Sequence, residues 1–86
     1  IREGLIEYIG TDHSPFTGED KERFGDDIFK APPGIAGLDV YVPLMLTAVH
    51  ERRLTLPQMV AVCSENPAFV FRLPNKGRMV AGTDAD

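Results

Sequence analysis

An aspartate and a histidine, Asp12 and His13, are the neighbouring residues best suited to chemistry. They follow an apolar run, residues 5–10, which Gly4 precedes and which is typical of a short buried strand. In parallel α/β folds, catalytic and metal-binding side chains gather at the carboxyl ends of strands. A carboxylate there can accept a proton from a metal-activated water and pass it to a leaving group. The alternative for a lone aspartate is a turn residue or a helix cap.

The elements that must position Asp12 begin with a long polar segment, residues 12–37. Proline and glycine punctuate both of its ends, and its centre, residues 19–23, is charged throughout. Loops of this length inside a compact domain are uncommon unless they are functional or disordered. We therefore predict a functional loop with anchored ends and a mobile centre.

Two helices are predicted after this loop. The first covers about residues 42–52, with Pro43 in its first turn, where a missing N–H costs nothing. The second begins at Thr55, which with Gln58 has the spacing of a capping box. Met59, Val60, Val62 and Cys63 are expected to form its buried face.

A short third helix is predicted from Asn66, as its cap, through Phe71. A turn over 74–77 and a strand over 78–80 follow. The order is that of the last βα unit of a TIM (β/α)8 barrel that continues into a separate β domain. A complete barrel needs roughly 200 to more than 400 residues, so we expect the chain to be incomplete on its own.

Composition narrows the function classes. The net charge is −4 and basic residues do not cluster, so no nucleic-acid partner is expected. No apolar stretch reaches the roughly 20 residues of a membrane span, and no signal-peptide pattern is present. Cys63 is the only cysteine, which excludes an internal disulfide and favours a reducing, cytoplasmic setting. We interpret Cys63, His50 and Glu65 as structural.

Four motifs in order carry a resemblance over essentially the whole chain. They lie at residues 9–15 (IGTDHSP), 31–38 (APPGIAGL), 64–68 (SENPA) and 76–86. Together they resemble the C-terminal part of the cyclic amidohydrolases, which comprise dihydroorotases, dihydropyrimidinases (hydantoinases) and allantoinases. The resemblance implies an α/β fold, with residues 1–73 in the TIM barrel and 74–86 at the start of a C-terminal β-sandwich.

The resemblance also implies the chemistry of the site. Asp12 would ligate one metal of a binuclear site, usually two zinc ions, and act as general base and then general acid. The other ligands, a His-x-His pair, a carboxylated lysine and two further histidines, would lie upstream. Its partners would be a small cyclic amide, the rest of its own barrel and further copies of itself.

His13 has a different expected role. Adjacent residues on an extended chain point in opposite directions, so His13 and Asp12 are not expected to bind the same metal. We interpret His13 as a residue that contacts the metal ligands without binding the metal, or as a structural histidine.

Three residues bear on the substrate by resemblance. Pro33 and Gly34 match the loop that holds the substrate ring through backbone groups, although a rigid Pro-Pro-Gly bend is the alternative. Phe16 stands where dihydroorotases carry a histidine that helps to hold a carboxylate, and a phenyl ring cannot donate a hydrogen bond. Dihydropyrimidinases match Phe16, yet they typically carry asparagine where this chain has Pro33.

We give Phe16 more weight than Pro33, because a lost charge partner matters more than a changed bend. The prediction is a hydrolase of dihydropyrimidine or hydantoin-type rings, followed by dihydroorotase and then allantoinase. A non-catalytic scaffold that keeps the barrel is the alternative from another class.

Overall fold

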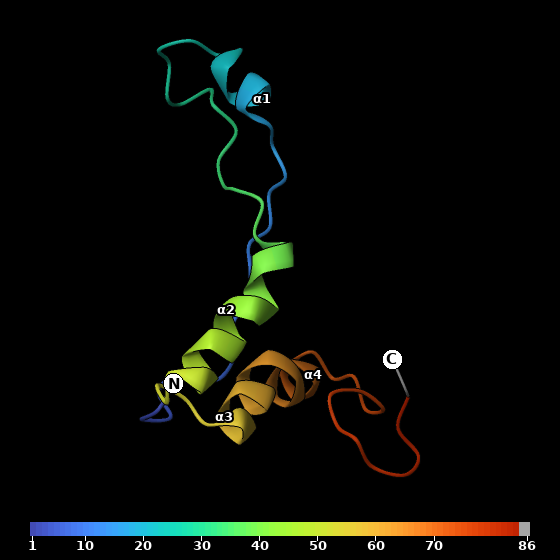
Figure 1. Cartoon of the computed structure of the whole chain (residues 1–86). Coiled ribbons are helices and arrows are strands. Elements are labelled where there is room, and N and C mark those ends of the chain that lie inside the picture. The colour runs from blue at the N-terminus through green and yellow to red at the C-terminus, as the bar shows by residue number, and fades with distance from the viewer. Residues whose placement is uncertain (85–86) are drawn as a thin grey trace. The chain divides into compact units, whose positions relative to one another are not determined.

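The computed structural model describes residues 1–84. Its helical elements are α1 (Gly18–Glu22), α2 (Leu38–His50), α3 (Leu56–Val60), the π-helix η1 (Ala61–Glu65) and α4 (Asn66–Val70) (Figure 1). The chain divides into two compact units, one formed by Thr11–Pro43 and the other by residues 1–10 together with those from Leu44 onward.

No strand is present among residues 1–84, so the strands expected over 5–10 and 78–80 are not observed. A strand is defined by the hydrogen bonds that it makes with a neighbouring strand, and neither segment has such a neighbour in this part of the chain. The backbone of 5–10 instead bonds to the helical segment: Ile9 N–H donates to the Val62 carbonyl oxygen at 3.1 Å. The barrel and the β-sandwich therefore stay predictions, and residues 85–86 of the predicted second domain lie outside the described residues.

Helix α1 occupies the centre of the long loop, where we expected a mobile segment. Thr17 caps it: its hydroxyl oxygen accepts from the Asp20 N–H at 3.1 Å. The Asp20 carboxylate accepts in return from the Thr17 N–H at 2.9 Å and from the Thr17 hydroxyl at 2.7 Å. This reciprocal capping box satisfies N–H groups that a short helix would otherwise leave to water. The spacing of Thr17 and Asp20 could have predicted α1, but Asp20 was interpreted as part of the charged loop centre.

Helix α2 begins at Leu38, four residues earlier than predicted. Pro43 consequently lies inside the helix and not in its first turn, so that prediction was wrong. Beyond the helix, the Arg52 backbone takes a positive φ of 58°, and Arg53 N–H donates to the Ala48 carbonyl oxygen at 2.9 Å. A left-handed residue after the last turn is a common way to end a helix.

The stretch from α3 to α4 is helical throughout (Figure 1). The predicted capping box is confirmed, because the Thr55 hydroxyl accepts from Gln58 N–H and the Gln58 side chain accepts from Thr55 N–H. The π-helix ends two residues before Pro67 of α4, with Asn66 N–H donating to the Ala61 carbonyl oxygen. Proline lacks an N–H and its ring crowds the carbonyl four residues back, so a wider turn at this place accommodates it.

Asn66 does not cap a new helix, contrary to the prediction. The residue before α4 is Glu65, which has helical backbone angles and no side-chain cap. The Asn66 side chain instead donates through Nδ2 to the Glu7 carbonyl oxygen at 2.7 Å. It thereby ties the segment 5–10 to the helical stretch, since both belong to one unit.

The core of the described residues is small. The buried apolar side chains are Met59 (8% exposed), Val62 (4%) and Ala68 (6%), whereas Leu5 and Phe69 are 81% and 84% exposed. The buried face predicted for the helix from Thr55 is correct at Met59 in α3 and Val62 in η1, whereas Val60 is exposed and Cys63 is half-buried. A chain of this length is marginal even with a full core, so these residues lack the apolar burial of an independent domain.

Within the described residues, every helix is too short or too polar to span a bilayer.

Candidate active-site segment

Asp12 has an unusual backbone conformation for a residue with a side chain. Its φ is 47°, in the left-handed region that aspartate tolerates better than most residues. Its side chain is exposed, and no hydrogen bond or ion pair joins the carboxylate to another described residue. A strained residue of this kind persists only where its surroundings hold it, so the contacts of its neighbours decide where the carboxylate lies.

His13 supplies one of those contacts. Its Nδ1 atom accepts from the N–H groups of Gly37 and Leu38, at 3.0 and 3.1 Å. Because Nδ1 accepts these two hydrogen bonds, it is not open to a metal. The first N–H groups of a helix have no acceptor within it, so His13 caps the start of α2. The metal-supporting role predicted for His13 stays a prediction.

The loop that carries Pro33 and Gly34 runs beside the segment that carries Asp12. Ser14 N–H donates to the Ile35 carbonyl oxygen at 3.0 Å, and the Ser14 hydroxyl donates to the Asp12 carbonyl oxygen at 3.3 Å. Gly34 has a φ of 92°, and a Cβ built on it would lie 2.6 Å from the Ser14 Cβ. The structure thus brings the Asp12 segment and the predicted substrate loop together in one unit, with glycine needed at the closest approach.

Lys21 also reaches this loop, and sequence reasoning missed it. Its Nζ atom in α1 donates to the Gly34 carbonyl oxygen. That carbonyl was a candidate for holding the substrate ring, and in this structure a lysine ammonium occupies it. No local pattern marks Lys21, because it lies in an ordinary charge run 13 positions before Gly34.

Phe16 lies two residues beyond Ser14, in the same turn. Its N–H donates to the Ser14 carbonyl oxygen at 2.8 Å, and its side chain is 46% exposed. The exposed ring adds apolar surface and no hydrogen-bond donor to this segment.

Asp12 fits a metal site as one ligand of several. Its carboxylate has the oxygen donors that divalent ions accept and has no competing internal partner among the described residues. Residues 1–84 contain no group of three or more histidine, cysteine, aspartate or glutamate side chains close enough to hold a metal. A zinc site with Asp12 as a ligand would need further ligands besides those that residues 1–84 bring together.

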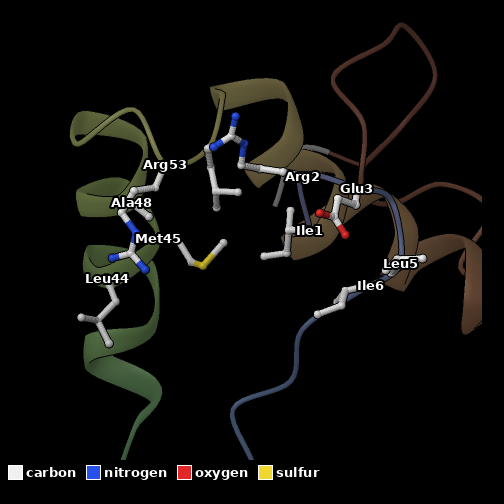
Figure 2. A pocket seen from close by; sticks show the side chains of 10 residues that line it. Ile1, Arg2, Glu3, Leu5, Ile6, Leu44, Met45, Ala48 and Arg53 are labelled. Carbon is white, nitrogen blue, oxygen red and sulfur yellow. The ribbon is translucent and has the colours of Figure 1, made fainter.

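A pocket of about 810 Å3 lies in the other unit. Figure 2 shows its mainly apolar lining, with Met45 of α2 and Ile1 projecting into it. The charged side chains at its rim are Arg2, Glu3 and Arg53, and none of the predicted site residues lines it. It lacks the convergent polar groups of a catalytic pocket.

Comparisons with known proteins place the chain among enzymes that the motifs indicated. It is 50% identical over 78 residues to the dihydroorotase of Methanosphaera stadtmanae, covering 91% of this chain and 18% of that protein. It is 40% identical over 86 residues to the dihydroorotase of Halobacterium salinarum, covering all of this chain and 20% of that protein. It is 42% identical over 88 residues to the L-hydantoinase of Paenarthrobacter aurescens, covering all of this chain and 19% of that protein.

These matches confirm the resemblance of the sequence to dihydroorotases and hydantoinases, the cyclic amidohydrolases that the motifs indicated. The chain spans about a fifth of the length of these curated relatives. No protein-family model matches it. No solved structure matches it.

Proposed function

We propose that these residues form part of a metal-dependent hydrolase that opens a cyclic amide, CO–NH, in a dihydropyrimidine or hydantoin-type ring. The observation that carries the proposal is the exposed Asp12 carboxylate, which has no partner among residues 1–84 and whose segment lies against the Gly34 loop through Ser14. The relatives' names support it, since dihydroorotase and L-hydantoinase both stand for enzymes acting on cyclic amides.

The fold that we propose is the last βα unit of a TIM barrel and the start of a β-sandwich. Apolar side chains along 5–10 and on the helices stay exposed, and Leu5 and Leu44 are examples. Such side chains are normally buried on both faces of a parallel sheet. The neighbouring strands and helices of a longer polypeptide would cover them.

The role of Asp12 in the proposed reaction is to move one proton twice. A divalent metal, when bound, polarises the amide carbonyl and activates the attacking water. The Asp12 carboxylate accepts the proton of that water as the oxygen bonds to the carbonyl carbon. It then gives the same proton to the ring nitrogen as the C–N bond breaks, so that a single ring-opened product carries both the new carboxyl group and the released N–H group.

The remaining parts of the proposal follow the family resemblance. We propose two zinc ions per site, with Asp12 as a ligand of one of them, and a cytoplasmic homo-oligomer that binds neither nucleic acid nor membrane. Metal analysis of the purified full-length protein tests the identity and number of the metal ions. Its mass in solution tests the oligomeric state.

A dihydroorotase is the second candidate function. The names of the two dihydroorotase relatives favour it, whereas Phe16, with no donor for a substrate carboxylate, favours an uncharged ring. Steady-state ring opening of hydantoin, dihydrouracil and dihydroorotate by the full-length, metal-loaded protein decides between them. Preference for the uncharged rings supports the first candidate, and preference for dihydroorotate supports the second.

Asp12→Asn tests the catalytic assignment. Asparagine tolerates the left-handed backbone as well as aspartate does, so the substitution removes the proton acceptor without adding backbone strain. We expect kcat for ring opening to fall by about 10²–10⁴-fold, the usual contribution of a positioned acid–base group. Near-normal turnover in Asp12→Asn would overturn the assignment, and a wild-type protein inactive on all three rings would favour a non-catalytic scaffold.

A further inference from the structure

We propose that His13 is a positioning residue whose Nδ1 atom holds the Gly34 loop and the start of α2 in register with Asp12. The inference rests on the proposed function for its kinetic consequence. Its structural part, a set of hydrogen bonds from His13 and Ser14 to residues 35–38 that we call the tether, can be tested without measuring activity.

The tether has three attachments in one unit of the chain. His13 Nδ1 accepts from Gly37 and Leu38 N–H, at 3.0 and 3.1 Å. The next residue, Ser14, donates its N–H to the Ile35 carbonyl oxygen at 3.0 Å. Two consecutive residues after Asp12 therefore bond to residues 35, 37 and 38. His13 does so through its side chain and Ser14 through its backbone.

The position of His13 makes this more than a helix cap. It is bonded directly to Asp12, whose φ of 47° is a conformation that needs support from its surroundings. His13 N–H also donates to the Thr11 hydroxyl at 3.3 Å, which closes a turn around Asp12. Loss of the Nδ1 acceptor would release both the loop and one flank of the catalytic residue.

Two substitutions separate Nδ1 from Nε2. The Oδ1 atom of asparagine occupies nearly the place of Nδ1, so His13→Asn keeps an acceptor for Gly37 and Leu38. The polar end of glutamine reaches nearer the place of Nε2, so His13→Gln loses that acceptor and keeps a polar group at the distal position. Both variants are uncharged, and their amide groups are chemically the same.

The kinetic test compares these two variants in the full-length, metal-loaded protein. We expect His13→Asn to keep kcat within about threefold of wild type and His13→Gln to lose on the order of 10²-fold, since a misplacement of about 1 Å can cost that much. A tether acting on Asp12 lowers kcat more than it raises KM. The reverse order, with glutamine active and asparagine not, would assign the role to Nε2 and overturn the proposal.

The second measurement is hydrogen exchange across residues 33–42, followed by mass spectrometry. We expect amide protection at Gly37 and Leu38 to survive in His13→Asn and to fall in His13→Gln. Equal protection in both variants would refute the tether. This measurement stands even if the wild-type protein opens none of the rings, so failure of the proposed function and failure of the tether give different results.

Discussion

Gly34 lies against Ser14 so closely that a Cβ atom built on Gly34 would fall 2.6 Å from the Ser14 Cβ and 2.7 Å from its hydroxyl oxygen. Real Cβ atoms do not approach other atoms to this distance, and the φ of 92° is one that only glycine adopts readily. The loop that carries Pro33 can therefore lie against the Asp12 segment only because residue 34 has no side chain. This contact makes the first prediction specific.

Gly34→Ala is expected to separate the loop from Ser14. The clash and the left-handed backbone together should cost on the order of 1–3 kcal/mol of stability, read as a lower urea midpoint of the full-length protein. Gly18→Ala is the matched control, because a Cβ there meets nothing within 4 Å and no positive φ is involved. Equal midpoints for the two variants would contradict the close contact.

Phe16→His is expected to shift substrate preference toward carboxylated rings. Imidazole supplies a donor where phenylalanine has none, and one hydrogen bond to a charged group contributes about 1.5–3 kcal/mol, or roughly tenfold or more in relative kcat/KM. The measurement is the ratio of kcat/KM for dihydroorotate to that for hydantoin. Phe16→Leu, which removes the ring without adding a donor, should leave the ratio unchanged. A ratio in Phe16→His equal to that of wild type would show that position 16 does not face the substrate.

The cap of α1 should depend on pH through Asp20. The Thr17 hydroxyl, and after it the Thr17 backbone N–H, lower the pKa of Asp20 from its usual 3.8 by hydrogen bonding to the charged carboxylate. The stabilisation by the ionised group is therefore fully present above pH 3.8 and is lost as pH falls through the lowered value. Carbon NMR titration of the Asp20 carboxyl in the full-length protein measures this directly.

Thr17→Val should raise the pKa of Asp20 part of the way back, since the backbone N–H bond stays. Thr55→Val is the control, because it disrupts the other capping box, whose partner is the uncharged Gln58. An Asp20 pKa that is the same in wild type and Thr17→Val would show that the Thr17 hydroxyl is not the cause of the lowered pKa.

Asn66→Asp should weaken the attachment of residues 5–10 to the helical stretch. The Nδ2 donor at 2.7 Å from the Glu7 carbonyl oxygen would be replaced by a second acceptor. Because this hydrogen bond is exposed, we expect a loss of about 0.5–1.5 kcal/mol, the net contribution of a typical hydrogen bond. We expect the order of urea midpoints to be wild type, then Asn66→Ala, then Asn66→Asp; a midpoint for Asn66→Asp equal to that of wild type would show that the bond contributes nothing.

Local sequence patterns predicted what depends on neighbouring residues. The capping box of Thr55 and Gln58 was correct because its two partners lie three residues apart on the same turn. The motifs around Asp12 and Gly34 indicated the relatives that the comparisons found, since sequence similarity is itself a property of the residue order.

Helix α1 was missed although its capping box, Thr17 and Asp20, is as local as that of Thr55 and Gln58, because the charged residues 19–23 were interpreted as the mobile centre of a loop. The start of α2, in contrast, depends on residues far apart in the sequence. The start of α2 was predicted at about residue 42, whereas the histidine that caps it lies 24 and 25 residues before Gly37 and Leu38.

The sequence by itself determined the resemblance to the cyclic amidohydrolases and the presence of a carboxylate, Asp12, after the apolar run at residues 5–10. Only the tertiary structure decided that His13, Ser14 and Lys21 all contact the loop at residues 34–38. Hydrogen bonds between distant segments depend on where the chain brings their atoms, and no spacing in the sequence encodes that. The strands predicted at 5–10 and 78–80 illustrate the same reason, because a strand exists through its bonds to a neighbour.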